Sequence, residues 1–278
     1  MKPAPFDYVR VESVASCIRE LGEAGGEGKI IAGGQSLVPV LAMRLSRPSV
    51  LVDIGRIPGL ARIDRHDGLL EVGAMARHAD LLDQRESPLL AEAARWIGHA
   101  AIRSRGTIGG SLAHADPAAE WPVVATALGA TVSIAGPSGR RGVGASDFFL
   151  GPLEPDLAPD EIVVSVTLPV PERWGFAEFS RRHGDFGLVT VVTTLVQGRW
   201  RVVIGGVAGV PAVAEEAGAI LSDSTGANAV VEAARAAAAS VAPSGDVHGS
   251  TEYRRAMVEV FASRAIAQAV APYPAGVS

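Results

Sequence analysis

Two adjacent glycines at positions 33–34 follow a short apolar run, residues 29–32, and precede the polar pair Gln35 and Ser36. Because glycine has no Cβ, backbone N–H groups in such a bend can approach an anion closely. A helix that starts directly behind the bend would add unpaired N–H donors, and Ser36 could cap that helix. The pattern indicates a phosphate site, and a plain strand-to-helix turn is the alternative reading.

A second pair of adjacent glycines, at positions 109–110, lies between two hydroxyl side chains, Thr107 and Ser111. Arg103 and Arg105 add positive charge just before it. This segment has the composition of a second anion-binding loop, with two ordinary loops as the alternative for the pair.

Acidic residues follow the second glycine pair at Asp116 and Glu120. Either carboxylate could accept a hydrogen bond from a ribose hydroxyl. Two anion loops with an acidic acceptor suit a ligand with two ends, such as a dinucleotide whose pyrophosphate lies between two parts of the fold.

The elements around these loops are predicted from apolar periodicity and from turn residues. The first part of the chain alternates helix and strand, and the last part places strands before helices, which together indicate an α+β fold. Helices are expected over residues 13–24, 37–45, 76–83, 88–97 and 123–128, and strands over 29–32, 49–54, 130–135 and 161–168. A hairpin is expected over 61–72, three consecutive strands over 176–179, 188–196 and 199–206, and helical segments over 212–241 and 252–270.

Composition excludes several classes of protein. The 25 basic and 30 acidic residues give a net charge of −5, which argues against nucleic-acid binding because phosphate contacts need clustered cations. The single cysteine, Cys17, cannot form an internal disulfide or hold an iron–sulfur cluster, and it favours a cytoplasmic setting. No signal peptide, membrane span, metal-binding motif, P-loop or G-x-G-x-x-G fingerprint is found.

Two motifs, AGGQSL at residues 32–37 and RSRGTIGGSLAHADPAAE at 103–120, resemble the FAD-binding subunit of the molybdenum hydroxylases. These are the medium subunits of aerobic carbon monoxide dehydrogenase and its xanthine-dehydrogenase-like relatives. The resemblance spans essentially the whole chain and continues at residues 147–149, 161–162, 168–169, 181–186 and 253–255. Gln35 favours the branch of carbon monoxide dehydrogenase, whereas Ser111 and Glu120 stand where Asn and Asp are common.

The resemblance implies a two-subdomain FAD-binding fold of the vanillyl-alcohol-oxidase-like, PCMH type in residues 1–170, with subdomains of about 1–57 and 58–170. A C-terminal α+β domain of the carbon monoxide dehydrogenase flavoprotein type, with a three-stranded antiparallel sheet plus helices, would occupy residues 171–278. No catalytic residue is expected, because the flavin supplies the chemistry. The implied cofactor-binding residues are Ala32, Gly33, Gly34, Gln35, Ser36, Leu37, Ile97, Thr107, Ile108, Gly109, Gly110, Ser111, Asp116, Glu120, Val163 and Arg182.

The implied function is electron transfer within a complex. A large molybdopterin-binding subunit would oxidise the substrate, and a small subunit with [2Fe-2S] clusters would pass electrons to FAD on this chain, which would deliver them to an external acceptor. The assembly expected is a dimer of heterotrimers. Two alternatives are a stand-alone FAD-dependent oxidoreductase acting directly on a small molecule, and a flavin-free structural partner.

Overall fold

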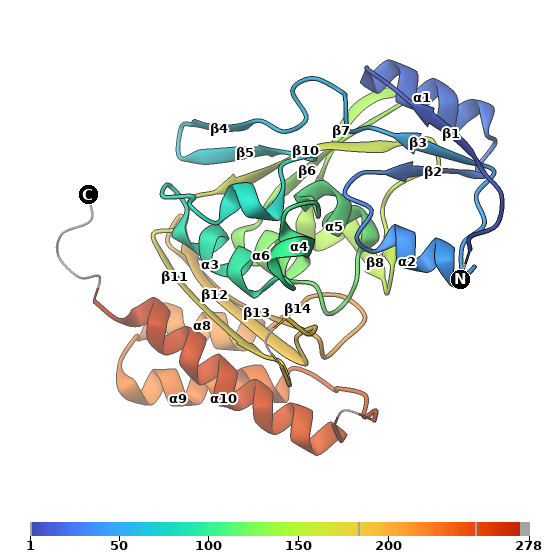
Figure 1. Cartoon of the computed structure of the whole chain (residues 1–278). Coiled ribbons are helices and arrows are strands. Elements are labelled where there is room, and N and C mark those ends of the chain that lie inside the picture. Colours follow the sequence, from blue (N-terminus) through green and yellow to red (C-terminus); the bar gives the residue numbers. More distant parts are fainter. Residues whose placement is uncertain (1, 183, 248, 273–278) are drawn as a thin grey trace.

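The computed structural model describes residues 2–182, 184–247 and 249–272 of the chain. Sheets and helices alternate in layers, with the C-terminal helices at the opposite end from β4 and β5 (Figure 1). The elements are β1 (Asp7–Arg10), α1 (Val14–Glu23), β2 (Gly28–Ile31), α2 (Leu37–Ala42), β3 (Val50–Asp53), β4 (Ile63–His66), β5 (Leu69–Gly73), the 3-10 turn η1 (His78–Leu81), α3 (Pro88–Trp96), α4 (Ala100–Arg103), α5 (Ile108–His114), α6 (Glu120–Leu128), β6 (Thr131–Gly136), β7 (Gly139–Gly144), α7 (Ala145–Phe148), β8 (Phe149–Gly151), β9 (Glu154–Pro155), β10 (Ile162–Pro169), β11 (Arg173–Phe179), β12 (Val189–Val196), β13 (Arg199–Gly205), β14 (Ala212–Val213), α8 (Glu215–Asp223), α9 (Ala227–Ala239) and α10 (Thr251–Val270).

The N-terminal part forms a parallel sheet in the order β1-β3-β2. The helix predicted over residues 13–24 is confirmed as α1, where the Ser13 hydroxyl accepts a hydrogen bond from the Ser16 N–H at 3.0 Å. Gly25 and Gly26 follow its C-terminus with φ of +58° and +90°, a conformation that stops a helix at little cost for glycine.

An antiparallel sheet follows in the order β4-β5-β10-β6-β7. The predicted hairpin is confirmed, since Asp67 and Gly68 turn with φ of +52° and +75°, and positive φ at both central residues suits a two-residue hairpin loop. In place of the helix expected over residues 76–83, the structure has only the short 3-10 turn η1. The segment that forms β7 was not predicted as a strand, because GRRGVG lacks alternating apolar residues.

The C-terminal sheet has four antiparallel strands, in the order β11-β12-β13-β14, where the sequence predicts three. The added strand, β14, is two residues long and pairs with Val203 and Ile204. This strand lies at the start of the Ala-rich stretch for which the sequence predicts helix. A strand of two residues is too short to show the alternation of apolar residues that predicts a strand. The α+β class is confirmed, with α8, α9 and α10 following the sheet.

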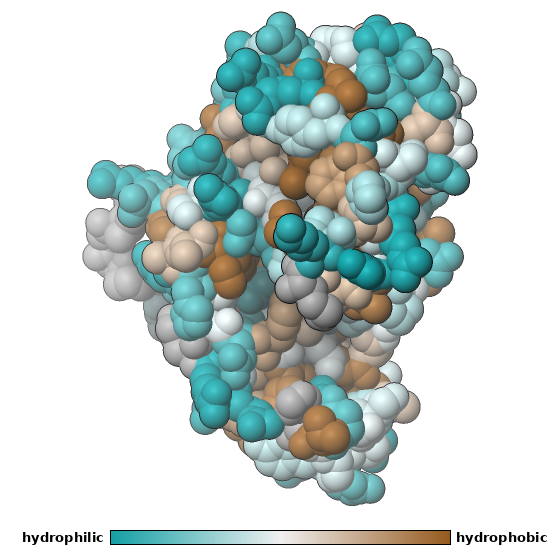
Figure 2. Space-filling model, turned by 45° about the vertical axis from the view of Figure 1, so that its right-hand side comes forward, coloured by the Kyte–Doolittle hydropathy of each residue, from teal (hydrophilic) through white to brown (hydrophobic). Residues whose placement is uncertain are grey.

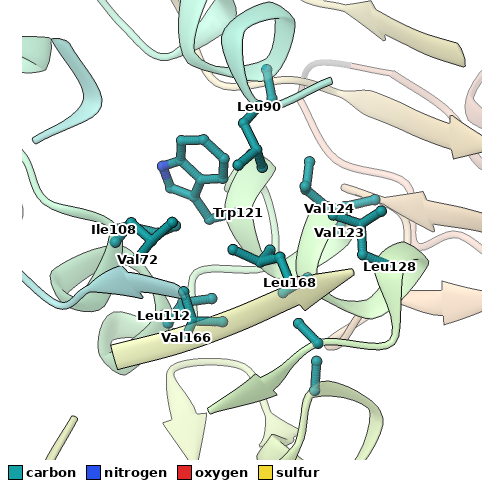
Figure 3. Close-up of a cluster of buried hydrophobic side chains, with 14 of the residues drawn as sticks. Val72, Leu90, Ile108, Leu112, Trp121, Val123, Val124, Leu128, Val166 and Leu168 are labelled. Carbon is teal, nitrogen blue, oxygen red and sulfur yellow. The ribbon is translucent and has the colours of Figure 1, made fainter. Parts of the chain in front are cut away.

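The C-terminal sheet packs on both of its faces. On one face Phe176, Val192 and Val203 join the core built around α3, α5 and α6, part of which is shown in Figure 3, where Trp121 and Leu112 lie near β10. The other face packs against α8, α9 and α10, largely through alanines. The sheet therefore fixes the position of α6 and of the loop after β11. Among the described residues, no helix combines the length and apolar character that a membrane crossing requires.

Candidate functional site

A cavity of about 740 Å³ lies where the two glycine motifs meet. Cofactor pockets commonly have volumes of a few hundred to about 1,000 Å³. Figure 2, turned so that the right-hand side of Figure 1 comes forward, shows a hollow near its centre. Most residues of the predicted site line this cavity, namely Ala32, Gly33, Gly34, Gln35, Ser36, Leu37, Ile97, Thr107, Gly109, Gly110, Ser111, Asp116, Glu120 and Val163.

The two motifs touch each other through Gly33. A Cβ at this position would lie 2.2 Å from the carbonyl oxygen of Arg105 and 2.8 Å from the Cα of Gly106. Real Cβ atoms do not approach backbone so closely, so glycine is needed here for the bends to meet. The structure thus brings both glycine pairs to one cavity.

The first bend presents free backbone donors to the cavity. Gly34 has a φ of +71°, and the Gln35 side-chain amide donates to the Gly33 carbonyl at 3.1 Å. Within the described residues, the N–H groups of Gly34, Gln35 and Ser36 make no hydrogen bond to protein. Successive unpaired N–H groups in a turn attract anions. Ser36 occupies the predicted N-cap position of α2, but its hydroxyl makes no capping hydrogen bond within the described residues.

The second motif differs from the loop that the sequence suggests, because its glycines lie in the first turn of α5. Ile108 and Gly109 donate their N–H groups to carbonyls of residues 76 and 74, both at 3.0 Å. The Gly110 N–H donates to the Thr107 hydroxyl oxygen at 3.2 Å. These donors already have acceptors in the protein. What the motif offers a ligand is therefore the bare backbone of its two glycines, together with the hydroxyl groups of Thr107 and Ser111.

Two residues of the predicted site do not line the cavity. Ile108 is 1% exposed and belongs to the central core. Arg182 is exposed, and its carbonyl accepts hydrogen bonds from Ser180 and Asp185. Residues 184–186, which follow it, do line the cavity, and His183 of the same motif lies outside the described residues.

His78 lines the cavity although no motif in the sequence places it there. Its ring is 5% exposed, and its Nδ1 accepts a hydrogen bond from the Trp121 indole N–H at 2.9 Å. Burial, together with the nearby charge of Arg103, lowers the pKa of His78 to about 4. The neutral ring therefore carries its proton on Nε2, and this donor is held in place by an indole 43 residues away in sequence.

This depressed pKa predicts a loss of stability in acid. Above the ordinary pKa of histidine the ring is neutral in both the folded and the unfolded chain, so its titration does not affect stability. At lower pH the unfolded chain binds a proton at this histidine and the folded chain does not, which lowers the free energy of unfolding. Between pH 6.5 and pH 4 the wild-type free energy of unfolding should fall by ~3 kcal/mol more than that of His78→Gln. Urea unfolding at several pH values measures this difference. The exposed His66→Gln is the control, and parallel curves for the wild type and His78→Gln would contradict the prediction.

Comparison with known proteins identifies the family of this chain. The family model described as the FAD binding domain in molybdopterin dehydrogenase matches residues 4–171, and the one described as the CO dehydrogenase flavoprotein C-terminal domain matches residues 174–269. The chain belongs to the family of FAD-binding flavoproteins of molybdopterin dehydrogenases. The resemblance seen in the sequence is confirmed, and this flavoprotein carries an FAD-binding domain.

Several relatives are similar to this flavoprotein along nearly their whole length. The chain is 44% identical to the 6-hydroxypseudooxynicotine dehydrogenase complex subunit alpha of Paenarthrobacter nicotinovorans, over 97% of this chain and 96% of the relative. A chain of quinoline 2-oxidoreductase from Pseudomonas putida 86 superposes with a TM-score of 0.91 and 36% identity, covering 97% and 98% of the two chains. A chain of carbon monoxide dehydrogenase from Hydrogenophaga pseudoflava superposes with a TM-score of 0.91 and 35% identity, covering 97% of this chain and 98% of the other. The flavoprotein is therefore an oxidoreductase subunit.

Proposed function

We propose that this flavoprotein holds FAD in the cavity between α2 and α5 and transfers electrons within a molybdenum hydroxylase complex. A small subunit with [2Fe-2S] clusters would supply the electrons, a large molybdopterin-binding subunit would oxidise the substrate, and an external acceptor would take the electrons away. Bound flavin accepts electrons singly or in pairs, which suits it to this place in the sequence of transfers. The observation that carries the proposal is the meeting of both glycine motifs at one cavity in a member of this family.

The first bend fits the pyrophosphate of FAD. Its unpaired N–H groups at Gly34, Gln35 and Ser36 would replace water around the anion, and α5 would contribute the hydroxyls of Thr107 and Ser111. Ile97 and Val163, which are 8% and 4% exposed, give the cavity apolar walls. We also propose that Arg182 is a basic residue near the flavin, because residues 184–186, which follow it in the chain, line the cavity.

The proposed organisation has a domain boundary near residue 170. The two family models meet between residues 171 and 174, and β10 ends at Pro169 before β11 begins at Arg173. We propose a PCMH-type FAD-binding domain over 1–170, with subdomains of about 1–57 and 58–170, and a C-terminal domain over 171–278. We further propose that the complex is a dimer of heterotrimers. Its proposed location is the cytoplasm, in agreement with the free, buried Cys17.

Reconstitution tests the proposal. The purified chain should quench the fluorescence of added FAD at a stoichiometry of one, and the complex isolated with its large and iron–sulfur subunits should show a flavin spectrum that substrate bleaches. The isolated chain should not oxidise that substrate. Turnover by the isolated chain would favour a stand-alone oxidoreductase, and absence of FAD from both preparations would refute the proposal.

A further inference from the structure

A row of residues across the C-terminal sheet ends against the start of α6. Glu178 on β11 pairs with Thr190 on β12, which pairs with Gly205 on β13. A Cβ at Gly205 would lie 2.3 Å from the Cγ2 of Val123, so the missing side chain lets the sheet approach α6 closely. The next residue, Gly206, donates its N–H to the Pro117 carbonyl at 2.9 Å. The row therefore places Glu178 on the face of the sheet that packs against α6, the helix that begins at Glu120.

Both carboxyl groups are buried, and neither forms an ion pair with another described residue. Glu120 is 5% exposed and lines the cavity, and Glu178 is 4% exposed behind it. One oxygen of Glu178 accepts a hydrogen bond from the Thr190 hydroxyl at 3.1 Å, and the other, Oε1, has no hydrogen-bond partner among the described residues. In the same part of the chain, no Lys or Arg forms an ion pair with either group.

The surroundings add negative charge to this arrangement. Asp116 precedes α6 and acts electrostatically on Glu120, while Glu120 acts on Glu178. From the loop after β11, Gly187 packs on the Glu178 carboxyl group and Asp185 lines the cavity. The cavity also holds the neutral His78. Burial raises the pKa of both glutamates. Repulsion by Asp116 raises the pKa of Glu120 further, and repulsion by Glu120 raises that of Glu178 further.

We propose that Glu120 and Glu178 form a buried acid pair that retains a proton between the two domains, so that Glu120 meets the ligand in the cavity as a hydrogen-bond-donating carboxylic acid. Two carboxylates this deeply buried cannot both ionise without a cation, and the unpartnered Oε1 of Glu178 is a place for the retained proton. That the ligand is FAD rests on the proposed function. The pairing of the two glutamates does not.

The ligand-free chain tests the pair itself. A carboxyl group with a raised folded pKa stabilises the fold at low pH, and this stability is lost as pH rises through the folded value. The folding equilibrium constant of the wild type should therefore fall between about pH 5 and about pH 9. Each proton that the folded chain holds and the unfolded chain has lost contributes a fall of up to tenfold per pH unit. The slope of the logarithm of this constant against pH should be smaller by about one proton in Glu178→Gln. The exposed Glu216→Gln on α8 should have the slope of the wild type. Equal slopes in all three would overturn the pair.

Titration with FAD tests the donor role. Glu120→Gln keeps a permanently neutral donor, so its FAD affinity should stay within about threefold from pH 6 to pH 9, whereas the wild type should bind about tenfold more weakly at pH 9 than at pH 6. A carboxylate acceptor at Glu120 would give the reverse, with tighter wild-type binding at high pH and weak binding by Glu120→Gln, and would overturn the proposal. If FAD binds to none of these proteins, the proposed function fails, while the slopes of unfolding still decide whether the pair exists.

Discussion

Replacing Gly33 by alanine should abolish useful FAD binding in an otherwise folded chain. The new Cβ would lie 2.2 Å from the Arg105 carbonyl oxygen and 2.8 Å from the Gly106 Cα, and backbone on both sides must move apart to admit it. The bend with the unpaired N–H groups would then leave the position that α5 defines. We expect the dissociation constant for FAD to rise at least about 100-fold, equivalent to about 2.7 kcal/mol.

Fluorescence quenching of FAD measures this loss, and circular dichroism shows whether the variant folds. Gly22→Ala is the matched control, because this glycine is exposed on α1 and no atom of the described residues lies within 4 Å of the place that the new methyl group would take. That variant should bind FAD normally and gain up to about 1 kcal/mol from better helix propensity. Wild-type affinity in a folded Gly33→Ala variant would show that the contact between the bends does not shape the site.

Replacing Arg254 by methionine should strongly destabilise the C-terminal domain. The Arg254 guanidinium is buried and donates to the carbonyls of Leu188 and Gly206 at 3.3 and 3.0 Å, and to the Asp246 carboxylate at 2.7 Å. It thereby connects α10 to one end of the sheet that carries Glu178, where the chain enters β12 and leaves β13. Loss of these bonds leaves two half-buried carbonyls without this donor, and we expect a cost of about 3 kcal/mol.

Thermal unfolding followed by circular dichroism should show this cost as a midpoint lower by roughly 5–10 °C. The neighbouring Arg255 is exposed on the same helix, so Arg255→Met should change the midpoint by no more than about 1 °C. Similar midpoints for the two variants would mean that the buried bonds of Arg254 are replaced by water at little cost. The prediction concerns stability, so FAD affinity measured well below the midpoint should change little in either variant.

Local chemistry in the sequence was sufficient to predict much of the fold. Ser13 and the glycines at 25–26 bound α1, Asp67 and Gly68 make the hairpin turn, and Gln197 and Gly198 turn with φ of +50° and +73° between β12 and β13. Each of these features depends on a few consecutive residues, because capping and positive φ are local properties. The two glycine motifs were equally visible, and their specificity was enough to indicate the family.

The tertiary structure decided what those motifs do. Whether a backbone N–H is free depends on which carbonyl the rest of the chain brings to it. Residues 74 and 76 accept from the first N–H groups of α5, whereas those of the first bend have no acceptor in the part of the chain that the structure describes. The same holds for His78, whose tautomer is set by Trp121, and for Glu178, on which Glu120 acts electrostatically although the two are 58 positions apart in the sequence. Burial and the identity of distant neighbours determine proton affinity, so these side chains acquire their chemistry only when segments distant in the sequence pack together.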